Sequence, residues 1–448
     1  MLRVVYYVFY QCKMIRFFVI ISVIVCSKNV YAATNNLTDC SQTTVQNAIN
    51  SSAVGDVLVC PAGSWSWSKV NITKNITLKG AGIGNTIITI TASGGITAPA
   101  SYSGAFRLTG FTFIASANFG NYWDAMLLVW ASKGFRIDHN EFQIYSSNPE
   151  PANAGGVGGN GLHILRSAAG LIDGNRFVKG GGGSTCIHAA IQISNSGTNM
   201  TSDQAQEYSW LNFDSNTVLG SATNTVFVDN NYFYNPNNCS QHNSHTIYNR
   251  HGGVVAFRHN EIHGFNADSH PFGSQHGGYV TEISNNSWIN DTGYNLYNLI
   301  DFAGGTGVIY GNTFTGSGTS IGIQLLFMRS SGAGGGSVTS YVPGYGTVSA
   351  DTACPSTERY PCAQQPGRGR NNSSDPLYIW GNTNFPALLN DAGTTYIQSG
   401  RDYFLNAGAK PGYKSYTYPH PLTGGEQPPP PPPPPGLIPM PPSNIRVN

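Results

Sequence analysis

One six-residue phrase recurs along most of the chain: an apolar residue, two variable positions, an asparagine, one variable position and a large apolar residue. The clearest copies are Phe257–Ile262, Ile283–Trp288 and Ile309–Phe314, whose asparagines are 26 residues apart in both steps. A fixed period of this size, with short β-type segments punctuated by Gly and Asn, is typical of a solenoid. The pattern therefore predicts a parallel β-helix in which each copy belongs to one coil.

Further copies extend the pattern in both directions. They are centred on Asn140, Asn175, Asn231 and Asn382, with a degenerate copy at Phe111. Equal positions of successive coils stack about 4.8 Å apart, so asparagine amides at a turn can hydrogen-bond along the stack. Asparagine also tolerates the left-handed backbone that a sharp corner requires. We therefore expect an asparagine ladder at one corner of the β-helix.

The composition fits such a fold and an exported protein. Charged residues make up only 10% of the chain and glycine contributes 54 residues, which suits tight turns and an uncharged interior. The formal net charge of +1 gives no basis for nucleic-acid binding. Residues 1–32 have a basic start, an apolar run and a small-residue end, as in a secretory signal peptide. We expect a secreted or cell-surface protein without a stable membrane span after cleavage; its oligomeric state stays open.

The cysteines point to disulfides rather than to a metal. Six of the eight lie beyond the leader, and an even number in an exported chain suggests disulfide pairing. We expect the pairs Cys40–Cys60, Cys186–Cys239 and Cys354–Cys362, although other pairings of six cysteines remain open. None of these pairs has the C-x-x-C spacing of a zinc site.

The chain divides into five segments. They are the signal peptide (1–32), an N-terminal cap (33–70), the β-helix (71–425), a proline-rich spacer (426–442) and the start of a further module (443–448). The cap contains a short amphipathic helix near Thr44–Ser52, which would cover the open end of the solenoid. Long Gly/Asn/Ser-rich insertions, such as 180–212, loop out of the coils and commonly form the walls of a binding cleft.

Several segments resemble a known superfamily. Gly55–Gly63 and Ile76–Gly82 are similar to the start of right-handed parallel β-helix proteins of the pectin-lyase-like superfamily. Pro376–Asn382 and Lys410–Leu422 resemble a bacterial exported branch of β-helix repeat proteins. The resemblance covers about residues 40–422 and implies an all-β, right-handed parallel β-helix. The superfamily contains calcium-dependent polysaccharide lyases, glycoside hydrolases and adhesins, and the hydrolase motifs of the polygalacturonase pattern are not found here.

Strand alternation predicts which side chains face outward beside the asparagine ladder. The residues two positions before each ladder position form the row Asp138, Asp173, Asp229, Arg258, Ser284, Tyr310 and Trp380. Glu282 lies in the next outward row, four positions before its asparagine. Stacking should therefore bring Asp229, Arg258 and Glu282 into one patch, with aromatic rings further along for sugar stacking.

This patch has the residue types that a polysaccharide lyase needs. Carboxylates such as Asp229 and Glu282 can bind Ca²⁺, which would neutralise a uronate carboxylate and acidify the adjacent C–H. Superfamily lyases use Arg or Lys as the base, so the resemblance makes Arg258 the candidate, although the ordinary pKa of arginine opposes this role. The expected substrate contacts are Asp173, His259, Tyr310 and Trp380. A surface ladder of ion pairs without any catalytic role is the structural alternative.

Histidines give a second signal. Seven of the eleven lie between positions 242 and 276. The segment with Asp268, His270 and His276 precedes the strand that carries Glu282, so its histidines are candidates for acid–base catalysis and Asp268 for metal binding. Histidine is also a common polar residue of glycine-rich turns, which would explain the concentration of histidines without any functional role.

Three function classes follow. We expect first a calcium-assisted lyase that cleaves a uronate-containing polysaccharide by β-elimination. The second is a non-catalytic extracellular glycan-binding or adhesive protein, for which the stacked coils are themselves the purpose. The third is a glycoside hydrolase with paired carboxylates, either Asp229 with Glu282 or Asp173 with Asp229.

Overall fold

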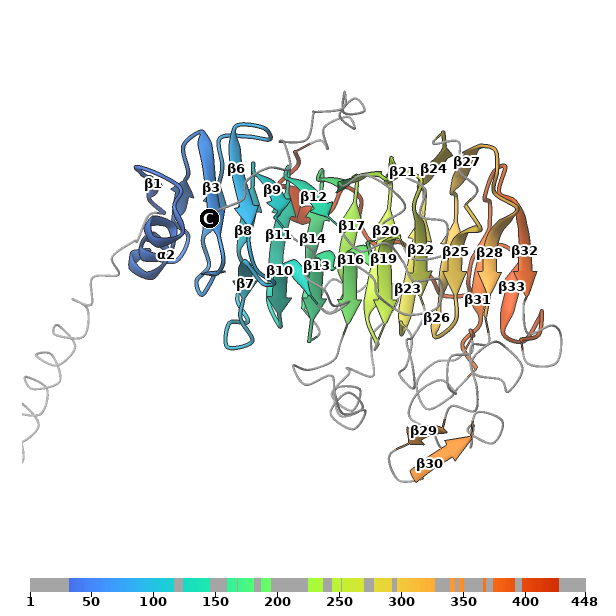
Figure 1. The fold of residues 1–448 in the computed structure, drawn as a ribbon. Coiled ribbons are helices and arrows are strands. Elements are labelled where there is room, and N and C mark those ends of the chain that lie inside the picture. Colours follow the sequence, from blue (N-terminus) through green and yellow to red (C-terminus); the bar gives the residue numbers. More distant parts are fainter. Residues whose placement is uncertain are drawn as a thin grey trace, which may run out of the picture.

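The structure is a computed structural model of the whole chain, and the part described here has several gaps. The described residues are 32–116, 124–145, 159–166, 168–180, 187–194, 225–236, 244–250, 252–269, 278–291, 296–326, 339–342, 346–349, 366–367, 374–390 and 397–426. They form three long parallel sheets, a small antiparallel hairpin and one α-helix (Figure 1). The fold is the right-handed parallel β-helix that the repeat and the resemblance predict.

Sheet A has twelve strands and contains the row predicted to face outward. In spatial order its strands are β1 (Thr34–Asn36), β2 (Val57–Val59), β5 (Thr77–Lys79), β8 (Arg107–Thr109), β11 (Lys133–Asp138), β14 (Ala169–Asp173), β17 (Val226–Asp229), β20 (Val254–Arg258), β23 (Val280–Ser284), β26 (Thr306–Tyr310), β31 (Leu377–Trp380) and β33 (Tyr403–Leu405). Non-consecutive numbering between neighbours shows that each strand pairs with the strand one coil away.

Sheets B and C complete each coil. Sheet B consists of β3 (Gly63–Trp67), β6 (Thr86–Ile90), β9 (Thr112–Ala115), β12 (Glu141–Tyr145), β15 (Arg176–Gly180), β18 (Tyr232–Tyr234), β21 (Glu261–His263), β24 (Ser287–Asn290) and β27 (Thr313–Gly316). Sheet C consists of β4 (Val70–Asn71), β7 (Ile96–Ala98), β10 (Ala125–Trp130), β13 (Asn160–Leu165), β16 (Ala189–Ser194), β19 (His245–Arg250), β22 (Asn266–Ser269), β25 (Asn298–Phe302), β28 (Ile321–Leu325) and β32 (Ala387–Asn390). A hairpin of β29 (Thr339–Val342) and β30 (Gly346–Ser349) is antiparallel.

The corner between sheets A and B is the predicted asparagine ladder. Asn260 shows its chemistry: its backbone N–H and its Nδ2 both donate to Oδ1 of Asn286 at 2.9 Å. Its Nδ2 also donates to the Val228 carbonyl oxygen at 2.8 Å. The residue before it, His259, has a φ of 56°, the left-handed conformation that lets the chain turn within two residues. The repeat therefore predicted both the corner and its hydrogen bonding.

The large apolar residue of each repeat points into the β-helix. Phe113, Phe142, Phe177 and Phe233 form an interior stack with successive ring centroids 5.3, 5.2 and 5.0 Å apart. All four rings are fully buried. Such offset stacking adds roughly 0.5–1.5 kcal/mol per pair to the gain from burial. The interior thus depends on equal residues at equal coil positions, as the period requires.

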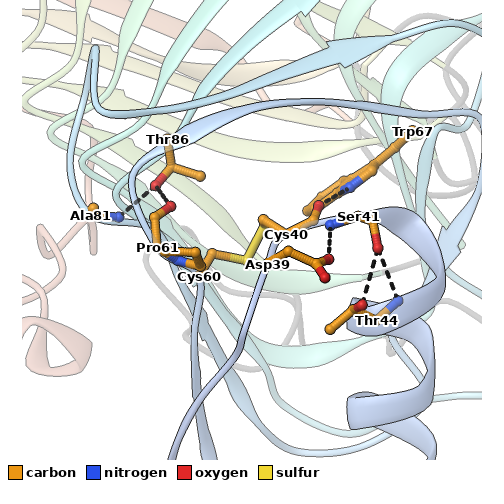
Figure 2. The surroundings of a disulfide bond; sticks show 9 residues. All are labelled: Asp39, Cys40, Ser41, Thr44, Cys60, Pro61, Trp67, Ala81 and Thr86. Carbon is orange, nitrogen blue, oxygen red and sulfur yellow. Dashed lines mark hydrogen bonds between the residues drawn. A yellow bond between two sulfur atoms is a disulfide. The ribbon is translucent and has the colours of Figure 1, made fainter.

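The N-terminal cap is the helix α2 (Gln42–Ser51) packed on the first coils. Its N-cap residue Ser41 accepts a hydrogen bond from the Thr44 N–H through its side chain, and Val45 and Ile49 are buried. The sequence placed this helix about two residues too late, because the capping serine was not identified. The predicted disulfide Cys40–Cys60 is confirmed (Figure 2). The other two predicted pairs lie outside the described residues, as do nearly all of the leader and the proline-rich spacer.

We expect loss of the Cys40–Cys60 disulfide to weaken the cap. The bond closes a loop with a sequence separation of 20 residues, so replacing both cysteines with serine should lower the free energy of unfolding by about 2–4 kcal/mol. Urea denaturation of the double variant against the wild type measures this. Equal midpoints would show that the packing of α2 alone holds the cap.

No helix of the described ranges has the length and apolar character that a membrane-crossing helix requires.

Candidate functional site

The strand register places the predicted outward row on sheet A in one line. Asp138, Asp173, Asp229, Arg258, Ser284, Tyr310 and Trp380 are directly paired from β11 to β31. Glu282 pairs with Ala256, so Glu282 and Arg258 lie on neighbouring strands in adjacent rows. The repeat therefore located this group of side chains correctly.

Most charged side chains of the row form ion pairs with a residue of a neighbouring coil. The Arg258 guanidinium donates to both carboxylate oxygens of Asp229, at 3.0 and 2.6 Å. Arg136 binds Asp173 in the same way, at 3.0 and 2.9 Å. Such bidentate pairs are the strong form of the arginine–carboxylate contact. Burial nevertheless raises the pKa of Asp229 to about 6, against the opposing effect of Arg258.

A C-terminal segment covers this row. We call residues 407–426 the strap; it contains the short 3₁₀ helix η3 (Pro421–Thr423) and runs back along sheet A towards the first half of the β-helix (Figure 1). The carbonyl oxygen of its Tyr416 accepts from Arg258 Nη1 at 3.0 Å. The carbonyl oxygen of Leu422 and the carboxylate of Glu426 contact Arg136 at 3.2 and 3.1 Å. The strap therefore spans strands that are far apart in the sequence.

Aromatic contacts fix the strap at other points. The Tyr418 ring stacks on His259 with centroids 3.7 Å apart, and its hydroxyl donates to Oδ1 of Asn230 at 2.5 Å. Tyr413 packs edge-on against Tyr310 and Trp380, whose own rings stack at 4.5 Å. These rings are engaged with each other and with the strap.

The closed strap covers much of the row to which the sequence assigned catalytic and binding roles. Asp173, Asp229, Arg258 and Glu282 are at most 3% exposed while the strap is closed. The Arg258 guanidinium occupies the position beside Asp229 that a cation would need, and Arg258 itself is held on both sides. The roles predicted for this row stay predictions: Arg258 as the base, Asp229 and Glu282 as calcium ligands, and the row as a substrate surface. The stacked pair Tyr310–Trp380 and the ring of His259 are partly buried and contact Tyr413 and Tyr418 of the strap.

The histidine-rich segment leads to a different face. His270 and His276 lie outside the described residues, whereas Asp268 belongs to β22 in sheet C. There it is part of an outward row of directly paired polar residues, namely His163, Gln192, Tyr248, Asp268, Asp301 and Gln324. Tyr248 and Asp301 were not identified from the sequence, because rows of sheet C cannot be counted from the asparagine ladder across loops of variable length.

Tyr248 is at the centre of a compact cluster on sheet C. Its ring is 4.4 Å from the His188 ring and 5.1 Å from the His245 ring, measured between centroids. The Arg250 guanidinium lies 5.3 Å from the centre of the same ring. His245 Nε2 is 3.7 Å from a carboxylate oxygen of Asp268. All five side chains are at most 5% exposed. Several ionisable groups are therefore buried close together, shielded from solvent.

Two neighbouring carboxylates make this cluster electrostatically unusual. Burial raises the pKa of Asp268 well above its usual range, the facing Asp301 raises it further, and Arg250 opposes both. Asn298 Nδ2 donates to Asp301 at 2.5 Å and to the side-chain oxygen of Gln324 at 2.7 Å. Two carboxylates with amide oxygens nearby form the donor set that Ca²⁺ prefers, and a cation would relieve the repulsion between them. Among the described residues, however, no group of three or more His, Cys, Asp or Glu is arranged to hold a metal ion.

Comparisons with known proteins bear on the fold. No protein-family model and no curated protein sequence matches the chain. An alginate lyase from Paenibacillus sp. str. FPU-7 is similar in structure, with 12% identity, a TM-score of 0.43, and coverage of 82% of this chain and 99% of that chain. The PL6 family polysaccharide lyase Pedsa3628 from Pseudopedobacter saltans has 11% identity, a TM-score of 0.39, and coverage of 85% and 94%.

A third solved structure is the A-module of the mannuronan C-5 epimerase AlgE6 from Azotobacter vinelandii. It has 13% identity and a TM-score of 0.34, with coverage of 84% of this chain and 97% of that chain. At these identities the likeness concerns the fold alone. The three parallel sheets of the chain and its asparagine corner make it a right-handed parallel β-helix.

Proposed function

We propose that this chain is an exported carbohydrate-active enzyme that cleaves a uronate-containing polysaccharide by β-elimination on the outer face of sheet C. The observation that supports this most is the cluster of His188, His245, Tyr248, Arg250 and Asp268 on neighbouring strands. Burying so many polar and charged groups costs stability. Proteins commonly retain such clusters of perturbed ionisable groups at sites of chemistry.

The cluster contains the groups that β-elimination requires. A base removes the proton beside the uronate carboxylate, and an acid protonates the leaving glycosidic oxygen. Tyr248 is our candidate for direct proton transfer, because its ring lies against two imidazoles, the side chains that most often exchange protons near neutral pH. Arg250 provides a fixed positive charge for the substrate carboxylate. When bound beside Asp268 and Asp301, Ca²⁺ would supply further charge neutralisation and make the abstracted proton more acidic.

We expect Tyr248→Phe to lower kcat by roughly 10²–10⁴-fold, because the change removes the proton-transfer group and leaves the ring packing. The assay follows the ultraviolet absorbance of the unsaturated product from a panel of uronate polysaccharides, with Ca²⁺ or with a chelator. Tyr403→Phe is the matched control, since Tyr403 lies on β33, the last strand of sheet A, away from sheet C. Unchanged turnover in Tyr248→Phe would remove Tyr248 from the reaction.

The same assay separates the other function classes. New reducing ends without an absorbance rise would indicate hydrolysis rather than elimination. Neither signal on any polymer, with retained glycan binding, would favour the non-catalytic binding protein. Calcium-independent elimination would keep the lyase and remove the cation from the proposal.

A further inference from the structure

The strap is attached in a way that allows it to leave the β-helix without unfolding it. No described part of it forms a strand with sheet A; apart from η3 it contacts the sheet through single side chains and carbonyl oxygens. The chain is exposed from Leu405 to Ala409, where the strap begins, and Gly408 has a φ of 87°. A segment that lacks backbone pairing with a sheet opens at a lower free energy than the paired core strands. Strap opening is therefore a separate equilibrium from global unfolding.

One histidine holds the last turn of the strap through an unprotonated nitrogen. His420 is the N-cap of η3, and its Nδ1 accepts a hydrogen bond from the Leu422 N–H at 3.1 Å. An imidazole that gains a proton on Nδ1 becomes a donor there and can no longer accept this bond. The ring is 6% exposed and lies against Phe227 and Tyr416, at 4.7 and 5.2 Å between centroids. Closure thus requires a neutral His420.

The charges that face this ring also oppose a proton. Burial lowers the pKa of His420 to about 4, with further lowering by Arg258 of β20 and Arg136 of β11. His259, under Tyr418, behaves alike: burial and then Arg258 lower its pKa to about 4. In the open strap, His420 returns towards its ordinary pKa of about 6.5. Closure is therefore favoured above that value and lost as the pH falls towards 4.

Acidic groups on the same face act in the opposite direction. Burial raises the pKa of Asp229 on β17 and of Asp173 on β14, so protonation of these two carboxylates favours closure. Glu426 of the strap does not belong with them, because it pairs with Arg136 and opening breaks that ion pair. Both aspartates keep their arginine partners when the strap leaves, because those partners belong to sheet A. A variant that changes only His420 keeps these carboxylates, so their contribution to the pH dependence of closure is the same as in the wild type.

We propose that the strap is an acid-sensitive cover of sheet A, in which protonation of His420 releases η3 and uncovers the row of charged and aromatic side chains beneath. The uncovered row combines arginine–carboxylate pairs with the stacked rings of Tyr310 and Trp380. Such a surface suits an extended ligand with both charged and ring-shaped groups. The inference is independent of the reaction proposed for sheet C.

The test compares the wild type with His420→Asn by hydrogen exchange of strap peptides across the acid range. Asparagine is a favoured N-cap that accepts the same N–H bond and does not titrate. We expect the opening constant of the wild type, relative to the variant, to rise roughly 20-fold from about pH 7 to about pH 5. The N–H groups of Leu422 and Thr423 report opening, and amides of β14 report the core.

Each outcome decides the proposal. A wild-type strap that loses protection on acidification while β14 stays protected, with a clearly smaller loss in the variant, supports it. Identical pH profiles in the two proteins, or a strap that stays protected to about pH 4, overturn it. If His420→Asn fails to close even at neutral pH, His420→Gln provides the second non-titrating acceptor for the same comparison.

Discussion

Replacement of Arg258 by alanine is expected to lower the free energy of unfolding by about 3–5 kcal/mol, because it leaves a buried carboxylate without its partner. Arg258 is 2% exposed and donates to both oxygens of Asp229. It also donates to the Tyr416 carbonyl oxygen and lies 4.9 Å from the centre of the Phe227 ring. One substitution therefore removes an ion pair, a strap contact and apolar packing together.

Urea denaturation of the purified variant measures this loss. Lys69→Ala is the control, because Lys69 is exposed and such surface changes usually alter stability by less than about 0.5 kcal/mol. The double variant Asp229→Leu with Arg258→Met removes both charges and should recover most of the stability, since an apolar replacement of a buried pair is often neutral.

The same variant separates the two readings of sheet A. If Arg258 were the base of a lyase, Arg258→Ala would abolish turnover and leave the unfolding midpoint unchanged. If Arg258 only forms a covered ion pair, we expect the opposite result. The variant then loses stability, and its activity falls only in proportion to the unfolded fraction. Full stability combined with a complete loss of turnover would contradict the structural role and restore sheet A as the catalytic face.

Sheet A was predictable because its rows are tied to the asparagine by short, constant spacing. Arg258 and Asp229 stand two positions before their ladder residues, so one count places both on adjacent strands, and the register agrees. Their burial was not predictable by the same means. The strap contacts Arg136 from Leu422, 286 positions away, through side chains that follow no period.

The sequence predicted only part of the cluster on sheet C. The concentration of histidines directed attention to the segment that contains His245 and Asp268. The distance between ladder and sheet C varies with the loops, so Tyr248 and Asp301 could not be aligned with Asp268 by counting. Their pairing depends on a register that includes an irregularity between His245 and Tyr248, which no periodic rule predicts.

Replacement of a central ladder asparagine should be among the most destabilising single changes in the chain. The side chain of Asn286 accepts from the N–H and the Nδ2 of Asn260 and donates to the Phe257 carbonyl oxygen and to Asn312 Oδ1, each at 2.9 Å. Asn286→Ala removes these four bonds and leaves buried polar groups on both neighbouring coils. At 1–3 kcal/mol for each unsatisfied group, we expect a loss of roughly 3–6 kcal/mol.

The end of the ladder provides the matched comparison. Asn382 accepts from Asn312 and donates to the Ile309 carbonyl oxygen, but it is only half-buried. Because water can satisfy the groups that Asn382→Ala exposes, this variant should lose clearly less stability than Asn286→Ala in the same urea titration. Equal losses would mean that each asparagine acts only through its own turn. A graded loss from centre to end would show that burial of a continuous stack determines how much each ladder residue stabilises the fold.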